Sequence, residues 1–389
     1  MRSGKAKTII PFDTRSTMNN PILQFGTSRF LQAHVDLFVA QATRREPSRA
    51  LGKITVVQTT ASAESRARID ALRANGRYPV RIRGRRHGET VDTTVECDAI
   101  TEALHANDDW QLLRERVAHD VQTIVSNTAD SGYALSANDT ADLLEGRRAP
   151  RGFAAKLAVL LHDRYRAGGG PITLLPCELV SHNGDTLRDL VTNVAQAWHA
   201  GADFIDYLTR RCVWVNSLVD RIVSEAIHPV GAIAEPYALW AIERKAGMTL
   251  PCEHADIVVT DDLAHYERLK LLLLNLGHTM LVESWLTHDG APDLIVLDAM
   301  RDASYRDALE AVWQDEVLPV FDALGQHDTA RAYLADVRDR FENPFLAHRL
   351  ADIARNHDEK KERRLRPVID LAEQLNLRIE QRRLRAALA

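Results

Sequence analysis

The sequence contains few cysteines, and their spacing argues against two kinds of structure. Among 389 residues there are 4 cysteines, Cys97, Cys177, Cys212 and Cys252, with no CxxC pair. A small disulfide-held domain and a structural zinc site both need closely spaced cysteines, so neither is predicted. Scattered cysteines are typical of proteins in a reducing compartment, and we expect the cytoplasm.

Long apolar runs and an excess of basic charge are also missing. No apolar run reaches the roughly 20 residues of a membrane-spanning helix, and residues 1–20 lack the apolar centre of a signal peptide. The net charge of -5 gives no general attraction for nucleic-acid phosphates, and the basic stretches 359–366 and 382–383 are interpreted as solvated helix faces. Neither a membrane nor a nucleic acid is therefore expected as a partner.

The first half of the chain has the pattern of an α/β domain. Its β-rich runs alternate with amphipathic segments, which is typical of a parallel sheet covered by helices. Two runs that alternate with a period of two about Gly84 to Gly88 predict an inserted antiparallel hairpin. The predicted strands are 22–25, 54–58, 122–126 and 172–176, the predicted helices 29–42, 109–118 and 152–167, and the hairpin strands 78–84 and 89–95.

The second half is predicted to be almost entirely helical. After about residue 212 the β signal nearly disappears, without a low-complexity linker. The predicted helices are 218–226, 236–246, 261–286, 305–324, 330–341 and most of 346–389. The sequence thus predicts a polar tail (1–20), an α/β domain (21–211) and a mostly α-helical domain (212–389), the last two packed around a shared cleft.

A glycine follows the first predicted strand, where a dinucleotide site needs one. Gly26 at a tight turn into a helix would let backbone amides approach a pyrophosphate. Only the first glycine of GxGxxG is present, so the turn by itself also fits an ordinary strand-to-helix connection. The second strand ends without the acidic residue that usually binds the ribose of NAD, and Arg66 and Arg68 leave NADP possible. The candidate cofactor-binding residues are Phe25, Gly26, Ser28, Arg29, Phe30, Gln58, Asn127 and Thr128.

One apolar run contains three polar residues that together suggest chemistry. On an α-helix, Lys270, Asn275 and His278 fall within an arc of roughly 140° and would share an interior surface. A lysine taken out of water either finds acceptors or has its pKa lowered, and an amine with a lowered pKa accepts a proton from an alcohol. Thr260, followed by two aspartates, is predicted to cap this helix. A lysine that reaches water beside a satisfied core histidine is the simpler alternative.

Three further segments supply candidate binding groups. Asn183 follows the strand 172–176, at the end where open sheets bind ligands, although Asn-Gly is also a common turn. Asp220 and Arg221 form a potential ion pair, equally suited to a structural or a binding role. The segment 342–360 adds His348, Arg349 and Lys360 as candidate groups for a polyhydroxy or carboxylate substrate.

These segments together resemble the polyol-specific long-chain dehydrogenase family, or mannitol dehydrogenase family, from about residue 21 to 366. The family includes mannitol dehydrogenase, mannitol-1-phosphate dehydrogenase and the hexuronate reductases acting on fructuronate and tagaturonate. The segments that carry the resemblance are QFGTSRFLQAH (24–34), SNTADSGY (126–133), PCELVSHNGDTL (176–187), VNSLVDRIV (215–223), EPYALWAIE (235–243), KLLLLNLGH (270–278) and NPFLAH (343–348). Cys-Glu-Leu at 177–179 and NPFLAH look closer to the hexuronate reductase branch.

The resemblance implies that residues 21–211 form a Rossmann-type dinucleotide-binding domain and residues 212–389 a mostly α-helical substrate and catalytic domain. It also implies hydride transfer between NAD, with NADP possible, and a secondary alcohol of a sugar acid or polyol, without a metal. The substrate would be mannonate, altronate or a mannitol-like polyol, and the product the matching ketose or keto-acid. The resemblance also implies Lys270 as the general base, Asn275 and Asn183 as an oxyanion hole, and His278 as the group that orients the substrate.

Two other functions stay open at this point. The chain could be a catalytically inactive dinucleotide-binding sensor of the same fold, or a metal-dependent hydrolase built on His254, Asp256 and His265. A monomer or a homodimer is expected.

Overall fold

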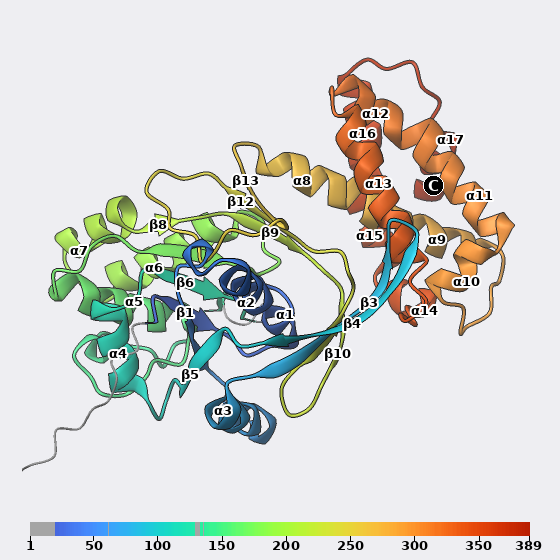
Figure 1. The fold of residues 1–389 in the computed structure, drawn as a ribbon. Coiled ribbons are helices and arrows are strands. Elements are labelled where there is room, and N and C mark those ends of the chain that lie inside the picture. The colour runs from blue at the N-terminus through green and yellow to red at the C-terminus, as the bar shows by residue number, and fades with distance from the viewer. Residues whose placement is uncertain (1–19, 61, 129–132, 135) are drawn as a thin grey trace, which may run out of the picture.

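The computed structural model describes residues 20–60, 62–128, 133–134 and 136–389. Most of the predicted polar tail, and residues 129–132 of the SNTADSGY segment, lie outside the described residues. Figure 1 shows an α/β part, coloured blue to yellow, and a helical part, coloured orange to red. Helix α8 and a long β-hairpin lie between the two parts.

A six-stranded parallel sheet forms the centre of the α/β part. Its order is β5-β2-β1-β6-β7-β8, and the order of the strands reverses between β1 and β6. Open parallel sheets bind ligands at the carboxyl ends of the strands at such a reversal. The strands are β1 (Ile22–Phe25), β2 (Ile54–Gln58), β5 (Ile100–His105), β6 (Thr123–Ser126), β7 (Thr173–Pro176) and β8 (Val213–Trp214). The predicted Rossmann-type fold is confirmed.

Helices cover both faces of this sheet, as two separate apolar cores indicate. One core lies under α4, α5 and α6, and the other lies under α2 and α3. The predicted helix 29–42 is interrupted at Ala33 and His34, whereas the other two predicted helices are present. The helices are α1 (Arg29–Gln32), α2 (Val35–Arg45), α3 (Ala63–Asn75), α4 (Trp110–His119), α5 (Phe153–Arg166), α6 (Asn183–Ala197) and α7 (Ala202–Asp206).

The predicted hairpin is confirmed and reaches the helical part. Strands β3 (Tyr78–Arg86) and β4 (Glu89–Cys97) pair antiparallel along their whole length. His87 and Gly88 form the two-residue turn with φ of 53° and 77°, the positive values that such turns require. At its tip the Gly88 N–H donates to Asp339, on α13 (His327–Phe341), so the hairpin links the two parts (Figure 1).

The predicted helices 218–226 and 236–246 are wrong, because both segments form strands. In a three-stranded sheet β12 lies between β9 and β13, antiparallel to β9 and parallel to β13. Three consecutive residues of β12 are buried, so the segment lacks the alternation that marks a half-exposed strand, and its Ala, Leu and Glu favour a helix. The strands are β9 (Ser217–Asp220), β10 (Val223–Ala226), β11 (Ala232–Ala234), β12 (Leu239–Glu243) and β13 (Ile257–Thr260).

The helical part begins after β13. Residues of β9, β11 and β12 share an apolar core with α2 and α3, whereas a third core contains only residues from Leu269 onward. The three cores therefore place the boundary between the two parts near residue 260, whereas the β signal in the sequence fades already at about residue 212. The mostly helical second part is confirmed. Its helices include α8 (Leu263–Leu269), α9 (Leu276–Thr287), α10 (Val296–Arg301), α11 (Ala303–Ala311), α12 (Leu318–Ala323), α13, α14 (Leu350–Ile353), α15 (His357–Arg364), α16 (Arg366–Gln374) and α17 (Arg382–Leu388). Within the described ranges, no helix has the length and apolarity needed to span a bilayer.

Candidate active site

The turn after β1 can only be built with glycine. Gly26 has φ of 113°, and a Cβ at this position would lie 2.8 Å from the backbone oxygen of Asn127 at the end of β6. The chain thus brings two backbone segments together at the point where the strand order reverses. This close approach is what a dinucleotide-binding turn requires.

A cavity of about 310 Å³ opens beside this turn. Five predicted cofactor-binding residues, Gly26, Ser28, Gln58, Asn127 and Thr128, line it. Arg68, predicted as a possible contact of the extra phosphate of NADP, lines it too, and the prediction missed eight further lining residues: Thr27, Thr59, Thr60, Ser65, Arg151, Gly152, Phe153 and Lys156. Several of these residues come from α3 and α5, whose first turns face the carboxyl ends of the strands. Their position at this edge of the sheet is the feature from which the sequence could have predicted them.

The charges around the cavity fit the phosphates of a dinucleotide. Arg68, Arg151 and Lys156 line it, and no described lining residue is a carboxylate. Lys156 is 3% exposed, and among the described residues it donates only to the Arg151 carbonyl, at 2.7 Å. Burial lowers its pKa to about 8, and Asp139 offsets this only in part. Buried cations of this kind are suited to an anionic ligand.

Three predicted cofactor contacts do not line this cavity. The Phe25 side chain is fully buried and packs edge-on against Phe153, so its assignment as a cofactor contact is not supported beyond its backbone. Phe30 stacks on His34, with ring centroids 4.8 Å apart, and Arg29 is exposed at the start of α1. Both stay predictions.

The helix that carries the polar trio has an unusual turn. Asp262 caps α8 by accepting the His265 N–H at 3.0 Å, so the predicted cap at Thr260 is wrong. Lys270–Asn275 is a π-helical turn between α8 and α9. Hydrogen bonds in a π-helix join residues five apart, so Lys270 and Asn275 lie on nearly the same side, closer than an α-helix would bring them. Such turns are frequent at functional sites.

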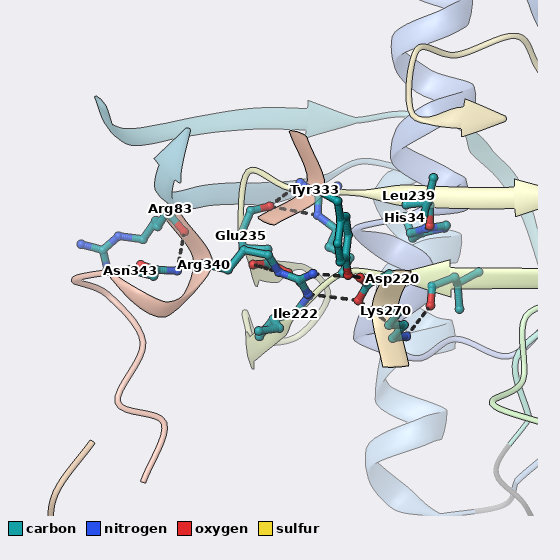
Figure 2. Close-up of polar contacts among 12 residues, drawn as sticks. His34, Arg83, Asp220, Ile222, Glu235, Leu239, Lys270, Tyr333, Arg340 and Asn343 are labelled. Atoms are coloured by element: carbon teal, nitrogen blue, oxygen red, sulfur yellow. Dashed lines mark hydrogen bonds and ion pairs between the residues drawn. The ribbon is translucent and has the colours of Figure 1, made fainter. Parts of the chain in front are cut away.

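Lys270 is held at the junction of the two parts. Its side chain is 19% exposed, and its Nζ donates to the Val219 carbonyl at 2.9 Å and lies 3.5 Å from Asp220 Oδ1 (Figure 2). Both partners belong to β9. The lysine therefore faces the α/β part from the π-helical turn that follows α8.

Asp220 belongs to a buried network that the sequence did not reveal. Arg340 donates to both oxygens of Asp220, at 2.8 and 3.0 Å, and also contacts Glu235, while the Tyr333 hydroxyl donates to Asp220 at 3.0 Å (Figure 2). Burial by itself would raise the pKa of Asp220, but Arg340 and then Lys270 hold it well below its ordinary value. The carboxylate is therefore ionised and fixes the position of Lys270.

The predicted Asp220–Arg221 pair is absent. The Arg221 guanidinium instead donates to two backbone carbonyls, those of Glu235 and Ala33. The pairing failed because adjacent residues on a strand point to opposite faces.

His278 lies beside His348, the histidine predicted near the end of the chain, whereas the Asn275 side chain is unpaired within the described residues. In the described part of the chain the Asn275 side-chain amide has no hydrogen-bond partner. His278 is buried, and its ring centroid lies 5.1 Å from that of His348 and 4.3 Å from that of Phe341. Burial, then the positive charge of neighbours, holds the pKa of His278 well below its ordinary value. A neutral imidazole offers one donor and one acceptor to a hydroxyl group.

Asn183 is not available as an oxyanion donor. Its Nδ2 donates to the carbonyls of Pro176, Glu178 and Ser217, at 2.9 to 3.1 Å, and its Oδ1 accepts two backbone N–H groups. The residue is 1% exposed, so these bonds fix β7 and α6 against β9. The predicted role of Asn183 in oxyanion stabilisation and substrate binding is therefore not supported by its geometry.

The other predicted substrate residues lie at different distances from the trio. Burial lowers the pKa of His348, Asp352 offsets this in part, and Lys360, on α15, lowers it further, so Lys360 lies within electrostatic reach of His348. Arg349 is exposed just before α14, and its side chain has no hydrogen bond to the described residues. Its role stays a prediction.

The residues of the hydrolase alternative do not form a metal site. No group of three His, Cys, Asp or Glu side chains in the described residues is arranged to hold a metal ion. His254 donates or accepts at Gln41, 2.9 Å away, and stacks on Phe38. The hydrolase hypothesis thus loses its proposed ligand set.

Comparison with known sequences decides the family. The profile of the mannitol dehydrogenase Rossmann domain matches residues 20–251, and that of the mannitol dehydrogenase C-terminal domain matches residues 262–389. The chain belongs to the mannitol dehydrogenase family. It is therefore an NAD(P)-dependent dehydrogenase, as the resemblance implied.

Two curated relatives show what kind of enzyme the chain is similar to. The altronate oxidoreductase of Halalkalibacterium halodurans is 30% identical over 380 residues, which cover 91% of this chain and 71% of that protein. The altronate oxidoreductase of Bacillus subtilis is 30% identical over 387 residues, or 93% of this chain and 77% of that protein. The predicted similarity to the hexuronate reductase branch is confirmed at this level.

Two solved dehydrogenase structures share the fold. A substrate-free D-sorbitol dehydrogenase superposes with a TM-score of 0.79 and 18% identity, covering 95% of this chain and 80% of the other. The Pseudomonas fluorescens mannitol 2-dehydrogenase, solved with NAD and D-mannitol, gives 0.69 and 18% identity, with 96% and 79% covered. At this identity the likeness supports the arrangement of the two parts.

Proposed function

We propose that the protein interconverts a secondary alcohol of a sugar acid and the matching keto-acid, using NAD or NADP and no metal. The observation that carries the proposal is the Lys270 amine, held by Val219 and Asp220 beside Asn275 and His278. The name shared by the curated relatives favours a sugar acid such as altronate over a polyol. Mannonate and mannitol-like polyols are the other candidate substrates.

Oxidation removes a proton from the hydroxyl oxygen as a hydride leaves the same carbon. When bound, the nicotinamide takes up this hydride, or returns it in the reverse reaction. Lys270, in its neutral form, accepts the hydroxyl proton while one N–H remains on the Val219 carbonyl. In the reverse direction the Lys270 ammonium, paired with Asp220, donates that proton to the oxygen of the ketone.

The oxygen carries partial negative charge during the reaction, and Asn275 is suited to stabilise it. Its amide has no other hydrogen-bond partner in the described residues, and it lies on the same side of the π-helical turn as Lys270. His278, kept neutral by burial, orients a neighbouring hydroxyl through a hydrogen bond. His348 and Lys360 bind the part of the substrate away from the reacting carbon.

The cofactor preference is left to experiment. The end of β2 carries Gln58, which accepts from Thr27 and donates to Thr60, in place of an acid. Arg68 lines the cavity and pairs with Glu64 at 2.7 Å, whereas Arg66 pairs with Asp108 on the exposed surface. NAD is the proposed cofactor, and Arg68 is the residue that would bind the extra phosphate of NADP. All four cysteines are free and buried, which suits the reducing cytoplasm that we propose as the location.

The test is a substrate screen with both cofactors. Altronate, mannonate and mannitol are each mixed with NAD⁺ or NADP⁺, and formation of the reduced nicotinamide is followed by absorbance. Turnover of a sugar acid supports the proposal. Cofactor binding measured by calorimetry, without turnover of any substrate in either direction, would instead support the inactive sensor.

A further inference from the structure

Two cations near the polar trio have no carboxylate partner. Lys360 and Arg364 lie four residues apart on α15, so they share one side of the helix. Helix α15 packs against α9 (Figure 1). In the described part of the chain no carboxylate oxygen lies within 4.0 Å of either cation. Neighbouring cations differ: Lys361 lies 3.6 Å from Glu283, and Arg366 lies 3.1 Å from Glu362.

Arg364 is fixed against the catalytic helix by one edge of its guanidinium. Its Nη1 donates to the Asn275 carbonyl at 3.2 Å and to the Thr279 hydroxyl at 3.0 Å. These bonds hold the guanidinium over the turn that presents the Asn275 amide. The rigid, planar group is thus positioned before any ligand arrives.

The other edge of the same guanidinium is unused. The Nε atom is buried and has no hydrogen-bond partner among the described residues, and the neighbouring Nη2 donates to none of them either. A half-buried cation whose N–H group has no acceptor lowers the free energy of unfolding, and a bound anion would remove this penalty. The Nε and Nη2 edge is the one that binds a carboxylate through two parallel hydrogen bonds.

The electrostatics agree with this geometry. Burial, and then Arg363, lowers the pKa of the Arg364 guanidinium to about 10, which leaves it charged at neutral pH. Burial, and then Arg364, lowers the pKa of Lys360. Arg364 also contributes to the lowered pKa of His278, so it lies within electrostatic reach of the proposed substrate.

We propose that Arg364, together with Lys360, binds the carboxylate of the substrate and so selects sugar acids over neutral polyols. The proposal rests on the function proposed above and deepens it, because it names the residue that binds the carboxylate of the substrate. The Arg364 fork binds both carboxylate oxygens, and Lys360 adds a second positive charge without a fixed geometry. A polyol with a hydroxymethyl group at that end leaves both cations without an anion.

The experiment compares Arg364→Met with Arg363→Met. Arg363 is the adjacent, exposed arginine, so its variant removes the same formal charge without touching the unused edge. For altronate, Arg364→Met is expected to lower kcat/KM by about 10²-fold, mainly through KM, since it removes charge-assisted hydrogen bonds made equally in ground and transition states. For the corresponding neutral hexitol, kcat/KM is expected to change less than about 5-fold. Arg363→Met should be within about 2-fold of the wild type for both.

Two further measurements keep the proposal falsifiable. Arg364→Lys keeps the charge but loses the fork, and it should recover about a tenth of the lost kcat/KM for altronate. Thermal unfolding of each variant identifies any loss caused by misfolding, and binding of altronate is then followed by calorimetry with cofactor present.

The outcomes separate this proposal from the proposed function. The carboxylate role of Arg364 is wrong if the wild type turns over altronate but Arg364→Met lowers kcat/KM equally for altronate and the hexitol. It is also wrong if Arg364→Met lowers kcat/KM no more than Arg363→Met does. In both cases the dehydrogenase function stands. A wild type that prefers the hexitol leads to the same conclusion. If the wild type turns over neither, the proposed function itself is wrong.

Discussion

Replacing Arg340 with methionine is expected to destabilise the protein strongly, because two buried carboxylates then lose their shared cation. The Arg340 side chain is 2% exposed, and its nitrogens lie 2.8 Å from Asp220 and 2.9 Å from Glu235. Those side chains are only 5% and 2% exposed. Methionine keeps much of the volume of the arginine stem, so the substitution mainly tests the charge.

The size of the effect follows from the burial. Removing one partner of a buried ion pair typically costs about 3–5 kcal/mol. At about 2.1 cal/mol/K of unfolding entropy per residue, a chain of 389 residues that unfolds as one unit loses roughly 1.2 °C of Tm per kcal/mol. The expected decrease in Tm is therefore about 4–6 °C.

A matched control lies two positions earlier on the same helix. Arg338 also pairs with a carboxylate, that of Glu310 at 2.6 Å, but the two side chains are 34% and 29% exposed. Arg338→Met is expected to cost at most about 1 kcal/mol, or roughly 1 °C. The assay is thermal unfolding followed by circular dichroism, with urea unfolding as a second measure. Equal, small decreases for the two variants would show that the buried Arg340 network contributes no more to stability than an exposed ion pair.

Three further outcomes are expected. Gly26→Ala should lower the free energy of unfolding by about 1–3 kcal/mol and weaken dinucleotide binding measured by calorimetry, because φ is 113° and the new Cβ would meet the Asn127 backbone. Gly170→Ala, with open space around it, should change neither quantity. Equal behaviour of the two variants would refute this reasoning. Burial lowers the pKa of His34 to about 3, so the folded protein loses stability as pH falls below the unfolded pKa of 6.5, by up to about 2 kcal/mol at about pH 5. His34→Gln should remove that part of the decrease in Tm. An unchanged dependence of Tm on pH in this variant would contradict the prediction. Asn275→Ala should lower kcat by about 10²-fold to 10³-fold with a smaller change in KM, and a kcat within a few-fold of the wild type would exclude it as the oxyanion donor.

Four strands of the central sheet were predictable because they are buried on both faces, whereas β5 and the two-residue β8 were not among the predicted strands. Runs such as Ile54–Gln58 are continuous and β-branched, and turn residues bound them. The same continuity misled the prediction at Leu239–Glu243, where a short buried strand is composed of residues that also favour helices. Its pairing with Ser217–Asp220 and Ile257–Thr260 decides its structure, and such pairing is not visible in a local pattern.

The site was predictable only in its local part. Lys270, Asn275 and His278 lie on one helical segment, so their spacing could be read from the sequence, although the π-helical turn could not. The network that holds Lys270 comes from elsewhere: its partner Asp220 precedes it by 50 positions, and Arg340, which pairs with Asp220, follows it by 70. No periodicity links residues so far apart.

Asparagines illustrate a second limit. The amide of Asn183 and that of Asn275 are chemically identical, yet the first is used up by backbone carbonyls and the second has no partner in the described chain. Only the surrounding backbone distinguishes a structural amide from one that is available to a substrate.

The most direct test of the proposed chemistry is the Lys270→Ala variant, assayed for turnover and for cofactor binding in parallel. We expect folding and the Kd for the dinucleotide to stay close to those of the wild type, while kcat falls by about 10³-fold or more, since the only proposed proton acceptor is removed. A variant that keeps most of its activity would contradict the assignment of Lys270 as the base.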